Sequence, residues 1–349
     1  MKSIILKSLL FSFLIVLVFT TSISIIGKPK NKNSDTSISK EVTVSFKEKQ
    51  VKIYSYDKIE NQHKKSISRL TYTKNIDEFN AKSMFNGKKL VYEGWVENNK
   101  MGIFSINSQN GKRKKIIYRD SNHNRFPSFN NDGKRIYFAA LRENKSMLLW
   151  MDTQGLGGLH ITPLASKGQI TSLSVSSNND IAFSQIIKGQ LDLQIINLKN
   201  NYTIKIANGG DVCWSPDGEK IAFVAISENK NRDIFIINKD GSNLIQLTNF
   251  EEDVSHPSFS PSGEFICFDA KMTSGEKSKK NEKKSLENWD VFMMDINGVQ
   301  LTQLTIDPSP DISPYWSQDG KIYFSSKRFG NYEIMVIGST KKTRLNETK

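Results

Sequence analysis

A hairpin-like segment recurs along most of this chain of 349 residues. Its best-formed copy is Asp211–Val224, in which an apolar strand, a Pro-Asp-Gly turn and a second apolar strand follow one another. Proline pre-sets φ for a turn, aspartate hydrogen-bonds its own backbone, and glycine accepts a positive φ. Since single hairpins occur in many folds, the repetition of this one is what constrains the architecture.

The turn position that needs a positive φ recurs six times, at intervals of 46, 46, 39, 45 and 57 residues. Asparagine fills one of these positions, and it is a common substitute for glycine in the left-handed region. A second and a third apolar strand follow each turn, and a fourth, more polar strand closes most copies. The six turn positions are Gly87, Gly133, Asn179, Gly218, Gly263 and Gly320.

Four short strands in every 40–50 residues are typical of a β-propeller. One four-stranded blade cannot bury both of its faces, whereas stacking blades around an axis does so. We therefore predict an all-β fold, a six-bladed β-propeller of four-stranded antiparallel blades. The strand-like residues 51–71 precede the first repeat and are expected to protect the edge at the seam. Seven blades with a partial N-terminal blade is the alternative.

The sequence around the turns resembles that of the WD40-like repeats of TolB-type propellers. The matching segments are Cys213-Trp-Ser-Pro-Asp-Gly218, Phe259-Ser-Pro-Ser-Gly263 and Trp316-Ser-Gln-Asp-Gly320, with the endings Leu247-Thr248 and Leu304-Thr305. The resemblance runs from about Leu70 to the C-terminus, and it implies a propeller and an exported protein. Only about 20–40 residues lie between the N-terminal signal segment and the first repeat, too few for the α/β domain of TolB, so we expect the propeller alone.

The N-terminus has the pattern of a secretory signal or a membrane anchor. Lys2 and Lys7 precede an uncharged apolar run over residues 8–26, a length that fits a long signal and nearly fits a bilayer span. We divide the chain into a signal or anchor at 1–27, a polar linker at 28–45 and the propeller at 46–349. The expected location is periplasmic, secreted or at the cell surface, and N-terminal membrane anchoring is the alternative.

Lysines dominate both the composition and the longest interruption of the repeat. The formal net charge is +13, and the interval before the last turn is lengthened by a polar insert at 271–288. Insertions in repeat proteins often lie on the binding face, so these lysines are candidates for contact with an anionic partner; the alternative is a solvated loop. No nucleic-acid motif is present. The candidate lysines are Lys277, Lys279, Lys280, Lys283 and Lys284.

The chain lacks the familiar catalytic motifs. None of its four histidines has a metal-ligand spacing, and neither a Gly-x-Ser-x-Gly elbow nor a phosphate-binding glycine loop occurs. We therefore expect no catalytic residue, no metal and no cofactor, and a protein that is not an enzyme. Cys213 and Cys267 are expected to be buried thiols rather than a disulfide.

Polar residues before several first strands are candidates for a binding site at one mouth of the central channel. They are Asp211, Asp253, His256, Asp311 and Ser313. The alternative is that they hold local backbone through hydrogen bonds. The predicted function is a non-enzymatic, exported scaffold for protein–protein interactions. The alternative function is a propeller that binds a small ligand, or hydrolyses one, with carboxylates at the channel mouth.

Overall fold

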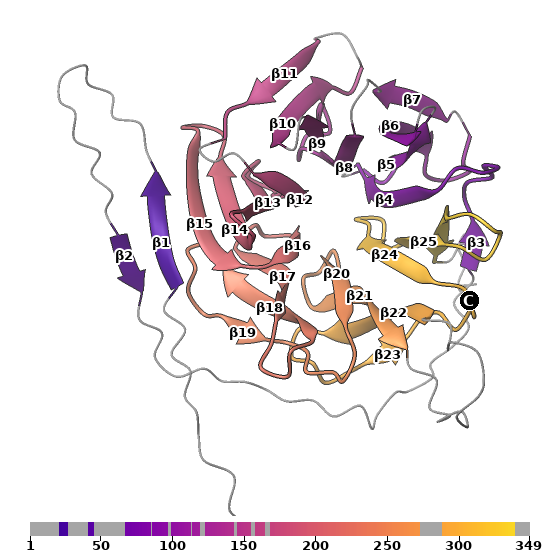
Figure 1. Cartoon of the computed structure of the whole chain (residues 1–349). Coiled ribbons are helices and arrows are strands. Elements are labelled where there is room, and N and C mark those ends of the chain that lie inside the picture. The colour runs from indigo at the N-terminus through magenta and orange to yellow at the C-terminus, as the bar shows by residue number, and fades with distance from the viewer. Residues whose placement is uncertain are drawn as a thin grey trace, which may run out of the picture.

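A computed structural model shows an all-β molecule (Figure 1). It describes residues 21–26, 41–44 and 67–338, apart from gaps at 85, 97–98, 113, 119–122, 143–144, 155–157, 165–167 and 273–287. Every regular element formed by the described residues is a strand. None of these residues forms a helix with the length and apolar character that crossing a bilayer requires.

Six antiparallel sheets surround a central axis, and the first strand of each lies nearest to that axis (Figure 1). Blade one comprises β4 (Glu78–Ser83), β5 (Lys89–Val96), β6 (Lys100–Asn107) and β7 (Lys115–Tyr118). Blade two comprises β8 (His123–Phe129), β9 (Arg135–Arg142), β10 (Lys145–Asp152) and β11 (Leu159–Thr162). Blade three comprises β12 (Gln169–Val175), β13 (Ile181–Ile187), β14 (Gln190–Asn197) and β15 (Tyr202–Asn208).

The second half of the chain continues the same order. Blade four comprises β16 (Gly210–Trp214), β17 (Lys220–Ile226), β18 (Arg232–Asn238) and β19 (Ile245–Gln246). Blade five comprises β20 (Val254–Phe259), β21 (Phe265–Met272), β22 (Asn288–Asp295) and β23 (Thr302–Gln303). Blade six comprises β24 (Asp311–Trp316), β25 (Ile322–Ser326) and β26 (Glu333–Ile337), and its outer strand is β3 (Ile67–Arg69). The predicted six-bladed propeller is therefore confirmed.

The ring closes by pairing the two ends of the propeller. β3 precedes blade one in the chain, yet Ile67 pairs with Ile337 and Arg69 pairs with Met335. The strand expected at the seam thus completes blade six. Leu70-Thr71 repeats the Leu-Thr ending of blades four and five. Thr71 Oγ1 accepts a hydrogen bond from the Ile334 amide at 2.9 Å, just as Thr248 Oγ1 in blade four accepts one from the Ile234 amide at 2.8 Å.

Two further strands lie outside the ring of blades (Figure 1). β1 (Thr21–Ile26) pairs antiparallel with β15 at the outer edge of blade three, and β2 (Glu41–Val44) pairs with β1. Most of residues 1–66 lies outside the described residues, so the division of the chain at 27 and 45 stays a prediction.

The core lies between neighbouring blades, where the second strands are apolar on both faces. Each contributes one aromatic side chain with at most 1% of its surface exposed: Tyr92, Phe138, Phe183, Phe223, Phe268 and Phe324. Since burying an aromatic side chain of this size contributes about 2–3 kcal/mol, this repeated position stabilises every interface between blades. Cys213 and Cys267 are both free and buried within such interfaces.

Candidate functional site

Each first strand contains an irregularity that aims one side chain into the central channel. The pairing of the first strand with the second shifts register at the same place in all six blades. Five of the six residues at this β-bulge have a positive φ, between 49° and 58°. Bulges bend a strand and redirect its side chains. The six bulge residues are Asn80, Phe126, Thr171, Asp211, His256 and Ser313.

The six bulge residues line one cavity of about 330 Å³, together with Lys82 and Arg125. We call this cavity the mouth pocket. It opens on the face formed by the loops that lead into the first strands and out of the second strands, the mouth face. The strands that flank the lysine-rich insert end on the same face, because Val254 at the start of β20 pairs with Ala270 near the end of β21.

His256 forms the most constrained polar contact of the mouth pocket. Its Nδ1 lies 2.9 Å from Oδ1 of Asp269, a carboxylate on β21 that is 1% exposed. Burial lowers the pKa of His256, but the charges of Asp269 and Asp211 and the hydrogen bond to Asp269 outweigh burial and raise the pKa to about 9. The imidazole is therefore a cation at neutral pH.

The second nitrogen of His256 is available to a ligand. Nε2 has no hydrogen-bond partner among the described residues, and the side chain keeps 36% of its surface exposed where it borders the pocket. Because Asp269 fixes the other nitrogen, the N–H group at Nε2 has a defined direction. This arrangement supplies a positioned donor of a proton or of a hydrogen bond.

Lys82 lies on the channel axis between the mouth pocket and a second cavity of about 130 Å³, and it lines both. Its Nζ lies 4.6 Å from the centroid of the Tyr315 ring. Burial lowers the pKa of Lys82, while the charge of Asp211 acts in the opposite direction. Burial raises the pKa of the Tyr315 phenol to about 12, so Tyr315 offers the lysine a neutral ring.

Arg125 adds a third cationic group, although a carboxylate neutralises it. Glu93 is fully buried and accepts from Arg125 Nη2 at 2.9 Å and from Asn80 Nδ2 at 2.7 Å. It also accepts from the Phe126 amide at 2.7 Å, which fixes the bulge of blade two. The guanidinium is 45% exposed and borders the pocket. Glu93 therefore positions the residues around it more than it contributes charge to the cavity.

The candidate residues from sequence fall into three groups. Asp211, His256 and Ser313 lie together in the mouth pocket. Asp253 instead accepts from the Arg232 amide at 2.9 Å and forms an ion pair with that arginine, and Asp311 is buried against Arg328 at 2.8 Å; both have local structural contacts. The five candidate lysines of the insert lie outside the described residues.

The pocket also contains residues that the sequence reasoning missed: Asn80, Lys82, Arg125, Phe126, Thr171 and, behind His256, Asp269. The position of the bulge residues within each repeat could have identified them from the sequence. Five of the bulge residues stand seven positions before the turn residue of their blade, and Thr171 stands eight positions before Asn179. Residue type does not reveal this set, because every blade places a different side chain there.

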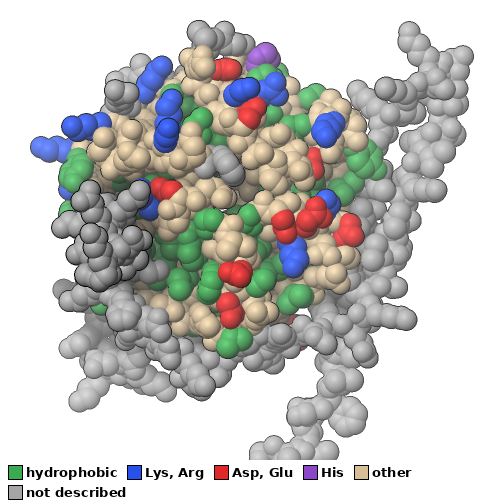
Figure 2. Space-filling model, turned by 180° about the vertical axis from the view of Figure 1, so that it is seen from behind, with side chains coloured by type: hydrophobic (Ala, Val, Ile, Leu, Met, Phe, Trp, Pro, Cys, Tyr) green, Lys and Arg blue, Asp and Glu red, His purple; other side chains and the backbone are tan. Residues whose placement is uncertain are grey.

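The charge at the mouth is mixed rather than acidic. Asp211 is the one carboxylate among the residues that line the cavity, beside the cations Lys82, Arg125 and His256. No three Asp, Glu, His or Cys side chains of the described residues come together as a metal site. Figure 2 shows one whole face, with basic side chains mostly in the upper half, over blades one and two, and acidic ones mostly below and to the right.

Comparisons with known proteins place the fold. No family model matches the chain. A curated relative, the uncharacterized peptidase YuxL of Bacillus subtilis (strain 168), is 31% identical over 134 residues, which are 32% of this chain and 20% of that protein. The match thus spans only a fifth of the relative's length.

Solved structures resemble the chain over most of the propeller. A protein described as TolB from Agrobacterium tumefaciens has a TM-score of 0.57 at 16% identity, over 78% of this chain and 96% of that one. TolB from Acinetobacter baumannii has a TM-score of 0.59 at 16% identity, over 75% of this chain and 66% of that one. An oligogalacturonate lyase in complex with manganese has a TM-score of 0.53 at 13% identity, over 78% of this chain and 93% of that one. The chain therefore has a TolB-like β-propeller fold, as the turn motifs implied.

These matches correct one expectation. The missing catalytic motifs led us to predict that the chain is not an enzyme, but the curated relative is named a peptidase and one structure of similar fold is a lyase. The prediction is wrong because the motifs that we sought belong to other folds. A propeller can instead build a site from single side chains contributed by separate blades.

Proposed function

We propose that the mouth pocket binds a small polar anion. The observation that carries this proposal is the state of Lys82: among the described residues no carboxylate lies within 4 Å of its ammonium group, and its contact is the Tyr315 ring. Lys82 is partly buried, and a charge withdrawn from water in this way is normally paired. An anionic ligand would supply the missing partner.

The neighbours of Lys82 support the same class of ligand. The protonated His256 borders the same cavity with its free Nε2, and Arg125 borders it from blade two. Asn80, Thr171 and Ser313 add groups that can hydrogen-bond to hydroxyl groups. The volume lies at the lower end for small-molecule sites. These features fit a small carboxylic acid that carries hydroxyl or carbonyl oxygens.

Titration with lactate by calorimetry at pH 7 tests the proposal. We expect Lys82→Met to weaken binding roughly tenfold to a hundredfold, because a charge-assisted hydrogen bond contributes about 1.5–3 kcal/mol. Lys82→Arg keeps the charge and should retain most of the affinity. The exposed Lys199→Met serves as the control and should bind as the wild type does. Equal affinity of the wild type and Lys82→Met would refute an anion site at this lysine.

We also propose that the mouth face contacts a protein partner of an exported propeller. Tyr72, Ile306 and Phe329 are 74%, 80% and 47% exposed and lie in loops of this face. The Arg69 guanidinium lies over the rings of Tyr72 and Phe329, 4.5 Å and 4.1 Å from their centroids. These contacts help to hold the two rings at the surface. Exposed apolar side chains that gather on one face favour protein contact.

Photo-cross-linking in intact source cells tests this second proposal. A photoreactive residue at position 329 should form a protein cross-link that the same residue at 159 does not form. Leu159 is a matched control, since it is also a partly exposed apolar residue but lies on the outer strand of blade two. The same cross-links at both positions, or at neither, would count against a partner on the mouth face. Fractionation of the same cells tests export.

A further inference from the structure

We propose that Lys82 is a nucleophile that condenses with the carbonyl carbon of a small oxo acid in the mouth pocket, forming a Schiff base. This inference rests on the proposed function and makes it more specific. It names the ligand class as a 2-oxo acid or a related aldehyde acid. It also assigns chemistry to a chain in which no nucleophile motif is evident.

The geometry around Lys82 carries the inference. A structural lysine extends to solvent or pairs with a carboxylate, whereas Lys82 lies inside the channel with cavity on both sides and an aromatic ring beside its nitrogen. A desolvated amine near a second cationic group is the usual setting of nucleophilic lysines. Here the second cation is His256, whose pKa the nearby charge of Lys82 lowers, and the burial of Lys82 favours the neutral amine.

The groups that face Lys82 come from several blades. Asp211 and His256 line the mouth pocket with it, Tyr315 lies against its nitrogen, and Cys213 lines the smaller cavity. The charge of Asp211 favours the charged amine, whereas burial favours the neutral one. Tyr315 keeps its proton at neutral pH. On the pocket side, Lys82 therefore faces His256, which can donate a proton, and Asp211, which can accept one. Tyr315 remains a neutral phenol and does not pair with the lysine as a phenolate.

The reaction balances with the groups present. The neutral Nζ forms a bond to the carbonyl carbon and loses one proton, while the carbonyl oxygen gains one, which gives a carbinolamine. The carbon–oxygen bond then breaks, and the hydroxyl leaves as water with a proton from His256 Nε2. The second proton of the nitrogen returns to the imidazole. The net change is amine plus carbonyl to imine plus water, and no oxidant or reductant is consumed.

Reductive trapping on the full chain tests the inference. The chain is incubated with pyruvate and sodium cyanoborohydride, which reduces imines, and its peptides are then analysed by mass spectrometry. We expect one reduced pyruvyl group on the peptide that contains Lys82, loss of this adduct in Lys82→Arg, and slower labelling of the wild type when excess lactate competes for the pocket. Unmodified lysines on the surface provide the internal control.

The outcomes separate this inference from the proposed function. If lactate binds in a manner that depends on Lys82 but pyruvate leaves no adduct there, Schiff-base formation is refuted and anion binding stands. If adducts spread evenly over surface lysines, the inference also falls. If neither acid binds, both proposals fall together. An unchanged circular dichroism spectrum and urea unfolding midpoint of Lys82→Arg show that loss of its adduct reflects the missing primary amine rather than misfolding.

Discussion

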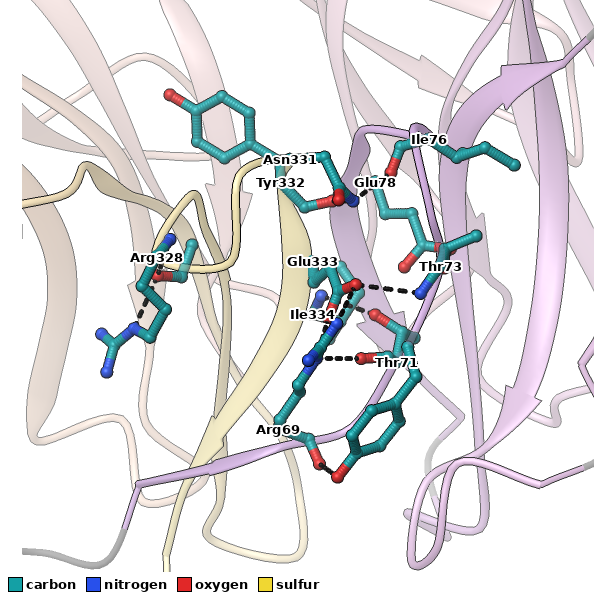
Figure 3. Close-up of polar contacts among 12 residues, drawn as sticks. Arg69, Thr71, Thr73, Ile76, Glu78, Arg328, Asn331, Tyr332, Glu333 and Ile334 are labelled. Atoms are coloured by element: carbon teal, nitrogen blue, oxygen red, sulfur yellow. Dashed lines mark hydrogen bonds and ion pairs between the residues drawn. The ribbon is translucent and has the colours of Figure 1, made fainter.

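Arg69→Ala should lower the free energy of unfolding by about 3 kcal/mol, because it leaves a buried carboxylate without its cation. Glu333 is 0% exposed and forms an ion pair with Arg69, whose side chain is 25% exposed. The same carboxylate accepts from the Thr73 amide at 2.9 Å (Figure 3). Since Arg69 belongs to β3 and Glu333 to β26, the pair joins the two ends of the propeller. Urea unfolding followed by tryptophan fluorescence measures the change.

The pair of Lys239 and Glu219 provides the matched control. Its atoms approach to 2.7 Å, but the side chains are 44% and 54% exposed, so Lys239→Ala should cost no more than about 0.5 kcal/mol. Glu333→Gln removes the charge while keeping the shape, and we expect a smaller loss than for Arg69→Ala. Equal effects of Arg69→Ala and Lys239→Ala would contradict a seam held by the buried ion pair.

The seam shows what repetition in a sequence predicts well. The six turns fix the number of blades, because each turn has its own second and third strands in the chain. The outer strand of blade six is harder to assign, since its Leu70-Thr71 ending stands before the first turn and 260 or so residues from its partner strand. The Thr71 hydroxyl accepts a hydrogen bond from the third strand of blade six, but this contact identifies the outer strand only once the strand pairing is known.

The mouth pocket was only partly predictable for a related reason. Asp211, His256 and Ser313 were found because they are polar residues in loops expected on one face. Lys82 was missed because it stands two positions after its bulge residue, where alternation alone does not reveal that it points into the channel. Asp269 was missed because its contact with His256 runs across two strands of one blade.

Asp253 and Asp311 lie outside the mouth pocket. Asp253 lies in the loop before β20 and Asp311 is the first residue of β24, yet their carboxylates point to neighbouring arginines rather than to the axis. Burial raises the pKa of Asp311, and the Arg328 guanidinium opposes that rise. A loop position therefore predicts the face on which a side chain lies, whereas the bulge decides whether it reaches the channel.

Asp269→Asn should shift the titration of His256 by the largest amount of any change around the pocket. The wild-type pKa of about 9 depends on the Asp269 charge, since burial alone lowers it. An asparagine oxygen can still accept from Nδ1, so the ring keeps its position while its pKa falls from about 9 toward the ordinary value of 6.5. NMR of the histidine ring protons measures this change, and His256→Gln assigns the signal. An unchanged titration would contradict the role of Asp269.

The same shift has consequences for stability and for binding. A histidine whose pKa is raised on folding contributes stability that is complete below pH 6.5 and is lost as the pH rises through 9. The wild type should therefore lose stability across this interval more steeply than Asp269→Asn.

Lactate affinity at pH 8 should fall in Asp269→Asn, whereas at pH 5, where both proteins carry the imidazolium, the affinities should converge. Asp253→Asn, which removes a charge only three residues from His256 but outside the pocket, should leave titration and binding unchanged. If Asp269→Asn matched the wild type in lactate affinity at pH 8, His256 would have no part in holding the anion, and Lys82 alone would carry that role.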